Sequence, residues 1–337
     1  MLVFVFPGQG SQAPGFLAPW LELPGAADRL RWASAVVGSD LVAHGTVSDA
    51  DTLRDTAVAQ PLIVAGGLLA LRELFASPAE LAAAAGAVAG HSVGELTAAA
   101  AAGALSPEQA LVLVRERGRA MAAAAAQRPT GMSAVLGGDP EEVAAVLARH
   151  GLTAANANGG GQVVAAGTLE ALEALRAEPP AKARVVPLQV AGAFHTEHMA
   201  PAVGTLEALA AGLEPGTAAV PVAANADGAL VTDGRELLRR LVAQVSRPVR
   251  WDLCTEAFAR LGVTALVELA PAGTLVNLAK RQLKGVETLA LRTPEDLDRA
   301  RTLIADHGGA TATAPTQLTA AQQTQQTQQQ TPQEVGP

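Results

Sequence analysis

The chain has 337 residues, of which 49% are hydrophobic and only 3% aromatic, and it carries a net charge of −8. This length provides one large or two ordinary domains, with a core built mainly from Ala, Leu and Val. The acidic balance argues against a general affinity for nucleic acid, and the one cysteine, Cys254, excludes a disulfide framework and is expected to be a buried structural thiol. No apolar run is long enough for a signal peptide or a membrane span, so we expect a soluble, cytoplasmic protein.

The N-terminal segment predicts a buried strand over 2–6, followed by a glycine-rich loop over 7–12. The run 8–13 has the spacing of a dinucleotide-binding fingerprint, but Pro14 and Gly15 stand where the phosphate-binding helix should begin. We therefore reject a dinucleotide site and expect the loop to present a backbone amide to a site at the sheet edge.

Two apolar regions come next, a helical one over 24–45 and a second stretch over 56–75. The first is expected to bury three of its side chains, Trp32, Val36 and Val37. The second is interrupted by residues that disfavour helices, Pro61, Gly66 and Gly67.

A serine flanked by glycines, in the segment 90–94, lies between a short apolar strand over 85–89 and an alanine-rich helix over 95–102. Such a turn lifts Ser92 out of the sheet, and the amide of Val93 points at whatever reacts there. The pattern Gly-x-Ser-x-Gly also occurs by chance in ordinary turns. The strand and helix on either side favour a nucleophile elbow, on which Ser92 forms a covalent acyl intermediate.

The middle of the chain predicts a separate small fold. A helix begins at the capping residue Ser106 and runs over 107–127. A strand–helix–strand–strand–helix–strand order follows it, with the elements expected over 132–136, 139–150, 153–157, 162–166, 169–177 and 184–190. This order is the split βαβ pattern of a ferredoxin-like domain.

The chain then returns to the large domain, with helices and strands expected over 201–212, 221–225, 236–245 and 265–269. We therefore predict an α/β fold with a large, α/β-hydrolase-like catalytic domain built on a parallel sheet over 1–127 and 195–309. The ferredoxin-like subdomain is inserted over 128–194. Residues 310–337 are Thr, Ala, Gln and Pro with almost no large apolar side chains, so we expect a disordered Gln-rich tail.

The serine needs a base, because a hydroxyl is a weak nucleophile at its ordinary pKa. His195 comes directly after a predicted strand and before a helix, where catalytic groups of α/β sheets gather. His198 is the rival, although it falls in the first helical turn and is expected to be more exposed. The nearest acid, Glu197, is too close in sequence to orient His195. We therefore expect a Ser–His dyad whose imidazole N–H is held by a backbone carbonyl or a side-chain amide.

Arg117 lies on the helix over 107–127 and shares an apolar stripe with Val114 and Met121. An inward-pointing arginine needs an anion, because an unpaired buried charge is very costly. The partner is either a core carboxylate, which is the commoner case, or a substrate carboxylate bound by two parallel hydrogen bonds. Periodicity hardly separates Arg117 from Arg115.

Five blocks of sequence together resemble the malonyl-CoA:acyl carrier protein transacylase family, over residues 2–307. The blocks are Phe6–Gln12, Gly90–Glu95, Arg115–Gly118, Ala193–His195 and Gln244–Trp251, in the family's order. The resemblance implies that Ser92 is acylated, that His195 is its base and that Arg117, rather than Arg115, binds the malonyl carboxylate.

The resemblance also implies binding roles for other positions. The backbone amides of Gln9 and Val93 would form the oxyanion hole, and a carbonyl of Gln244 would orient the histidine. Phe194 corresponds to the malonyl-selecting variant, whereas branched-chain enzymes of the wider family tend to carry Ser there. Asn158 begins the loop Asn-Gly-Gly-Gly-Gln, where many members have Asn-Ser-Pro before the Gln, and it is assigned to the substrate pocket.

The implied activity moves malonyl from malonyl-CoA through a malonyl-serine to the phosphopantetheine thiol of acyl carrier protein, in fatty-acid or polyketide synthesis. No cofactor and no metal are expected, and the family implies a monomer. The carrier protein is expected to be acidic, so local basic residues must steer its docking onto this acidic chain. The densest basic cluster is Lys280, Arg281 and Lys284, and Lys182 and Arg184 form a second one; each could equally be a solvated face.

Two other functions are compatible with parts of the sequence. An α/β-hydrolase-type serine esterase or thioesterase would use the same elbow, but it would need a triad acid between serine and histidine and would have no use for Arg117. A non-enzymatic assembly protein would recruit partners through the Gln-rich tail and would need no mounted serine.

Overall fold

The apolar strand expected at the N-terminus is the centre of the large sheet. In the computed structural model, which describes residues 1–309, β1 (Leu2–Phe6) is buried along its whole length and pairs in parallel with a strand on each side. The strand order is β11-β10-β1-β2-β7-β8. The other strands are β2 (Ala87–Gly90), β7 (Val222–Ala223), β8 (Leu230–Val231), β10 (Ala265–Glu268) and β11 (Glu287–Ala290).

This sheet is mixed rather than purely parallel. β8 runs antiparallel to β7 at the edge, with Val222 opposite Val231. Only residues 224–229 connect the two strands, and parallel strands need a crossover of about a dozen residues or more. The expected α/β fold is confirmed, and the expected parallel sheet is corrected at this edge.

Helices cover both faces of the large sheet because β1 is apolar on both. Leu2, Phe4 and Phe6 join one core cluster, and Val3 and Val5 join another, since successive side chains of a strand point to opposite faces. The first face is covered by α1 (Ala18–Leu21), α2 (Ala26–Val37), α3 (Leu41–Thr46), α4 (Thr56–Arg72), α5 (Pro78–Ala84), α6 (Gly94–Ala101), α7 (Pro107–Ala125), α10 (Ala200–Ala210), α11 (Gly234–Gln244) and α14 (Leu297–His307). The second face is covered by α12 (Trp251–Arg260) and α13 (Thr274–Gln282). Short 3-10 turns lie at Thr52–Arg54, Glu197–Met199 and Pro294–Asp296.

Two local expectations are wrong in this layer. Trp32 is 43% exposed, because α2 turns Leu30, Ala33 and Val37 towards the core and Trp32 lies on the other side of the helix. Most of the stretch 56–75 forms one helix, α4, which ends at Arg72 and continues through Pro61 and both glycines. Burial of most of α4 outweighs its weak helix propensity, and the absence of a side chain at 66–67 lets neighbouring elements approach closely.

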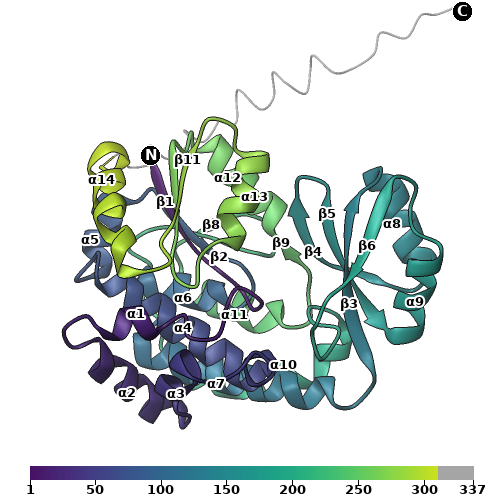
Figure 1. Cartoon of the computed structure of the whole chain (residues 1–337), viewed down its shortest axis with the longest axis horizontal. Helices are drawn as coiled ribbons and strands as arrows, with labels where there is room; N and C mark the ends of the chain where they lie inside the picture. Colours follow the sequence, from purple (N-terminus) through teal and green to yellow (C-terminus); the bar gives the residue numbers. More distant parts are fainter. Residues whose placement is uncertain (310–337) are drawn as a thin grey trace, which may run out of the picture.

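The second sheet has the order β6-β3-β5-β4-β9 and stands beside the main body (Figure 1). Its strands are β3 (Thr130–Gly137), β4 (Thr153–Gly159), β5 (Gln162–Thr168), β6 (Ala183–Pro187) and β9 (Val249–Arg250). The first four pair antiparallel, whereas β9 pairs in parallel with β4. α8 (Pro140–Arg149) and α9 (Leu169–Ala177) cover one face with their own core cluster, and Met132 and Val164 on the other face join the main core.

The described part of the chain contains no helix long and apolar enough to cross a membrane. The tail expected to be disordered, 310–337, lies outside the described residues.

Candidate active site

The elbow forms because its glycines allow the backbone to fold tightly on itself. A Cβ at Gly90 would overlap the backbone of Gly94, and a Cβ at Gly94 would overlap the carbonyl of Phe6 at the end of β1. Between them Ser92 has a φ of 53°, a left-handed conformation that is uncommon for a non-glycine residue. Its backbone N–H donates to Asn225 Oδ1 at 2.8 Å, which holds the turn in place.

His195 meets Ser92 as expected. The Nε2 atom lies 2.7 Å from Ser92 Oγ, and Nδ1 lies 2.8 Å from the backbone carbonyl oxygen of Gln244. Because a carbonyl only accepts, Nδ1 carries the proton, and Nε2 is left to accept the serine hydroxyl proton. His195 also has a positive φ, 61°, and strained backbone of this kind concentrates at functional sites.

Burial keeps the imidazole neutral. His195 is only 3% exposed, and burial together with the nearby charge of Arg117 lowers the pKa of His195 to about 3. The rival, His198, lies half-buried in the following 3-10 turn, and within residues 1–309 it makes no hydrogen bond to the serine. The pair is therefore a dyad held by a carbonyl, as the absence of a suitable acid in the sequence led us to expect.

Arg117 is buried at the same place and is held by neutral groups. It is 2% exposed, and it donates to Gln60 Oε1 at 2.6 Å and to Gln244 Oε1 at 2.9 Å. Its Nη2 also lies 3.4 Å from Ser92 Oγ. Within residues 1–309 no carboxylate lies at ion-pair distance from Arg117, and burial lowers the pKa of its guanidinium to about 10. The guanidinium is charged at neutral pH and, in the part of the chain that the structure describes, has no anion in contact.

Arg115 has a different environment. It pairs with Glu116 at 2.7 Å, donates to the carbonyl of Val36, and is partly exposed. The structure thus separates the two arginines that periodicity left unresolved. Next to Arg117, α7 packs closely on α4, because a Cβ on Gly118 would come within 2.8 Å of the Thr56 carbonyl oxygen.

The glycine-rich loop after β1 packs directly on the elbow. A Cβ at Gly8 would lie 2.7 Å from the carbonyl oxygen of His91, so only glycine permits this approach. The side chain of Gln9 points away and donates to the carbonyl of Arg54 and the hydroxyl of Thr56, both at 3.3 Å. Among residues 1–309 the backbone N–H groups of Gln9 and Val93 have no hydrogen-bond partner, so both are available to an oxyanion.

Asn158 and Phe194 were also assigned to the site from the sequence. Asn158 Oδ1 is 2.9 Å from Nε2 of His91, the neighbour of the serine. In the described part of the chain Asn158 makes no hydrogen bond to Ser92, His195 or Arg117. Phe194 is 6% exposed and packs in the main core. The structure therefore brings Ser92, His195, Arg117 and Gln244 into contact. Asn158 contacts His91 instead, which precedes Ser92 in the chain.

Three buried polar residues in this network were not assigned a role from the sequence. Asn225, at the end of β7, accepts from the amide of Ser92 and donates to the carbonyl of Gly90 at 2.7 Å. Gln60 anchors Arg117, and Glu95 accepts from Gln244. The available signals were a glutamine inside an otherwise apolar stretch, an asparagine at the end of the short strand predicted over 221–225, and a glutamate inside an alanine-rich helix.

The basic cluster Lys280, Arg281 and Lys284 is exposed at the C-terminal end of α13. The adjacent Gln282 donates to the backbone carbonyl of Asn158 at 2.8 Å, so the cluster lies beside the turn between β4 and β5. Asn158 in turn lies 2.9 Å from His91, so Gln282 and Asn158 link the basic cluster to the residue beside the serine.

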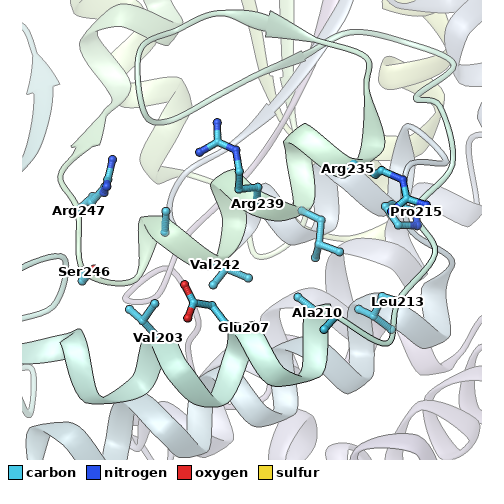
Figure 2. A pocket seen from close by; sticks show the side chains of 13 residues that line it. Val203, Glu207, Ala210, Leu213, Pro215, Arg235, Arg239, Val242, Ser246 and Arg247 are labelled. Atoms are coloured by element: carbon cyan, nitrogen blue, oxygen red, sulfur yellow. The ribbon is translucent and has the colours of Figure 1, made fainter.

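A groove of about 580 Å³ lies between α10 and α11 and is lined by Arg235, Arg239 and Arg247 (Figure 2). None of Ser92, His195 and Arg117 lines it. A smaller cavity of about 180 Å³ shares Arg239 and Arg247 with this groove and reaches the buried Glu95 and Gln244. Among residues 1–309 no group of three or more His, Cys, Asp or Glu side chains could hold a metal ion.

Comparison with known proteins agrees with this geometry. Residues 3–328 match the acyl transferase domain family, and the match together with the fold defines an acyltransferase. The chain is 50% identical to the malonyl CoA-acyl carrier protein transacylase of Mycobacterium tuberculosis over 303 residues, which are 90% of this chain and 100% of that protein. The chain belongs to the malonyl CoA-acyl carrier protein transacylase family.

Solved structures are similar over almost the whole described chain. The crystal structure of MCAT from Mycobacterium tuberculosis, 50% identical, gives a TM-score of 0.84 over 89% of this chain and 99% of that chain. A type II PKS acyl-carrier protein in complex with its malonyl-transacylase contains a chain that is 32% identical, with a TM-score of 0.81 over 89% of this chain and 98% of that one.

Proposed function

We propose that this protein transfers malonyl from malonyl-CoA to the phosphopantetheine thiol of acyl carrier protein through a malonyl ester on Ser92. The observation that carries the proposal is the convergence of a serine, a neutral histidine and an arginine that contacts no anion among the described residues. Family membership supports it, since relatives at 50% identity are named malonyl CoA-acyl carrier protein transacylases.

The first half-reaction acylates the serine. Ser92 Oγ attacks the thioester carbonyl carbon while Nε2 of His195 takes the hydroxyl proton. The negative charge that develops on the carbonyl oxygen is stabilised by the backbone amides of Gln9 and Val93. The C–S bond then breaks, and the proton on His195 passes to the departing CoA thiolate. The imidazolium that forms transiently is stabilised by the carbonyl of Gln244 at Nδ1.

Arg117 selects the acyl group. The malonyl carboxylate carbon is two C–C bonds, or roughly 2.5 Å, from the thioester carbonyl carbon, so its partner must lie beside the attacking serine. Nη2 of Arg117 lies 3.4 Å from Ser92 Oγ and meets this requirement. An acetyl group has no carboxylate and leaves the buried guanidinium without an anion, so it is discriminated against.

The second half-reaction reverses the first with a different thiol. The phosphopantetheine thiol of the carrier protein attacks the malonyl ester, and its proton goes through Nε2 of His195 to Ser92 Oγ as the ester C–O bond breaks. We propose that the carrier protein docks on Lys280, Arg281 and Lys284, a choice supported by their exposure and by their position beside the β4–β5 turn. The remaining pocket contacts assigned by resemblance, Phe194 and Asn158, belong to the same proposal.

The rival function, a serine esterase or thioesterase, is not favoured. Such an enzyme uses a carboxylate to orient its histidine, and Nδ1 of His195 bonds to a backbone carbonyl instead. It would also leave the buried cation of Arg117 without a purpose.

We further propose an α/β-hydrolase-like catalytic unit over 1–127 and 195–309 and a ferredoxin-like subdomain over 128–194. The antiparallel order β6-β3-β5-β4 and the separate core under α8 and α9 support the second unit, although β9 joins its sheet from outside that range. We expect a cytoplasmic monomer that needs no cofactor and binds no nucleic acid.

Mass spectrometry after incubation with malonyl-CoA tests the proposed function. We expect one added malonyl group on the wild type and none on Ser92→Ala, and loss of the label when a phosphopantetheinylated carrier protein is added. The label should survive with a carrier protein that lacks the prosthetic group. An unlabelled wild type, or release of free malonate as fast as transfer, would contradict the proposal.

A further inference from the structure

Glu95, the residue after the elbow, takes part in none of the steps above, yet its side chain is buried within the site. It is 2% exposed and accepts a hydrogen bond from Nε2 of Gln244. We propose that Glu95 is a positioning residue that sets the direction of the Gln244 side-chain amide, so that the amide oxygen faces Arg117 and holds it for a substrate carboxylate. This inference rests on the proposed function and names a determinant of its acyl selectivity.

The side-chain amide of Gln244 is hydrogen-bonded at both of its ends. Its amide oxygen accepts from Arg117, and its NH2 group is surrounded by three acceptors: Oε2 of Glu95, the carbonyl of Ser92 at 3.1 Å and Oδ1 of Asn225 at 3.0 Å. A flipped amide would place its NH2 group against the guanidinium, where two donors would face each other. The surrounding acceptors therefore decide which end of the amide meets Arg117.

Glu95 is the one of these acceptors that carries a charge. Its second oxygen, Oε1, accepts from the backbone N–H of Asn225 at 2.8 Å, so both carboxylate oxygens face donors. Only an ionised carboxylate accepts at both oxygens without carrying a proton of its own. Hydrogen bonds to a charged group are roughly twice as strong as neutral ones, so Glu95 contributes most to the orientation of Gln244.

The substitution Glu95→Gln removes one acceptor and adds a donor. The N–H of Asn225 belongs to the backbone after β7 and cannot turn away, so the new amide oxygen stays with it. The NH2 group of the new glutamine then faces the NH2 group of Gln244. Either the Gln244 amide flips and turns its own NH2 group towards Arg117, or Gln244 loses its hydrogen bond to residue 95. In both cases the arginine loses a fixed anchor.

Protonation of Glu95 has the same consequence as the substitution, because a protonated carboxyl also presents a donor. Burial raises the pKa of Glu95 to about 7, partly offset by its hydrogen bonds and by the charges of Arg117 and Arg240. The other titratable or charged groups around it are Cys254, Asp227, Arg239 and Arg247. The cavity of about 180 Å³ that touches both Glu95 and Gln244 is not lined by Ser92, so protons can reach the carboxyl from outside the acyl site.

The test compares acylation of Ser92 by malonyl-CoA and by acetyl-CoA at low substrate concentration, for wild type, Glu95→Gln and Glu268→Gln. Glu268 is the matched control: it is fully buried and accepts three backbone N–H bonds at the start of α13. We expect Glu95→Gln to lower the malonyl-to-acetyl rate ratio by at least about tenfold, mainly through malonyl. Glu268→Gln should lose stability and keep the wild-type ratio.

The wild type alone provides a second measurement that requires no variant to fold. Its malonyl-to-acetyl ratio should rise as the pH increases from about 6 to about 8, since the malonyl carboxylate is already ionised across this range. The ratio of Glu95→Gln should stay low and flat. A wild type that is labelled at Ser92 but has a pH-independent ratio, or a Glu95→Gln variant with the wild-type ratio, would overturn the inference alone. A wild type that malonyl-CoA does not label would overturn the proposed function as well.

Discussion

Replacing Arg117 by lysine keeps the buried charge and removes the planar fork. Nη1 of the guanidinium donates to Gln60, and Nη2 donates to Gln244 and lies 3.4 Å from Ser92 Oγ. The group has further N–H donors for a substrate carboxylate. An ammonium has only three donors on a single nitrogen, so it cannot bind both glutamines and grip a carboxylate with two parallel bonds.

The magnitude follows from the number of bonds lost. At least one charge-assisted hydrogen bond to the carboxylate disappears, which is worth about 1.5–3 kcal/mol and lowers kcat/KM for malonyl-CoA by about 10- to 150-fold. Acetyl-CoA has no carboxylate, so its transfer should change by less than about threefold.

The assay is single-turnover labelling of Ser92 by either thioester, followed by mass spectrometry. Arg115→Lys is the matched control, since it lies on the same helix, is partly exposed and pairs with Glu116. Equal malonyl rates for Arg117→Lys and wild type would refute the reasoning. A parallel fall with both thioesters would also refute it, because it would indicate general damage to the site.

Three other predictions concern the elbow, the histidine and the docking surface. Gly94→Ala should abolish labelling of Ser92, since the added Cβ overlaps the end of β1, and urea unfolding should show a loss of about 1–3 kcal/mol or more. The pKa of His195 is lowered to about 3 in the folded protein, so this residue's contribution to stability is complete above about pH 6.5 and is lost as the pH falls towards 3. The stability advantage of wild type over His195→Gln should therefore shrink by up to about 1.4 kcal/mol per pH unit between about pH 6 and pH 4. Lys280→Glu combined with Arg281→Glu should raise KM for carrier protein and leave KM for malonyl-CoA unchanged.

Matched variants make these outcomes decisive. Gly204→Ala on α10, where a Cβ meets nothing within 4 Å, should keep full labelling. Charge reversal at Arg299 and Arg301, both exposed on α14, should leave KM for carrier protein unchanged. A constant wild-type advantage over His195→Gln across the acid range would contradict the lowered pKa. An active Gly94→Ala variant would contradict the steric account of the elbow.

The amino-acid sequence by itself determined the features that depend on neighbouring residues. The elbow follows from glycines at 90 and 94, and the helix that carries Arg117 begins at the capping box of Ser106 and Gln109. The continuous apolar run over 2–6 likewise predicted a buried strand, which is β1. These patterns are local, because the turn chemistry, capping and side-chain period act within a few residues.

Tertiary structure decided everything that depends on partners far away in the chain. Arg117 is held by Gln60 and Gln244, which are 57 and 127 residues away from it in the chain. Packing also decided that Trp32 stays exposed and that α4 continues through Pro61, since burial of a whole helix face outweighs local propensity. Buried polar groups must find partners wherever the fold brings them, and no pattern within one segment records which groups those are.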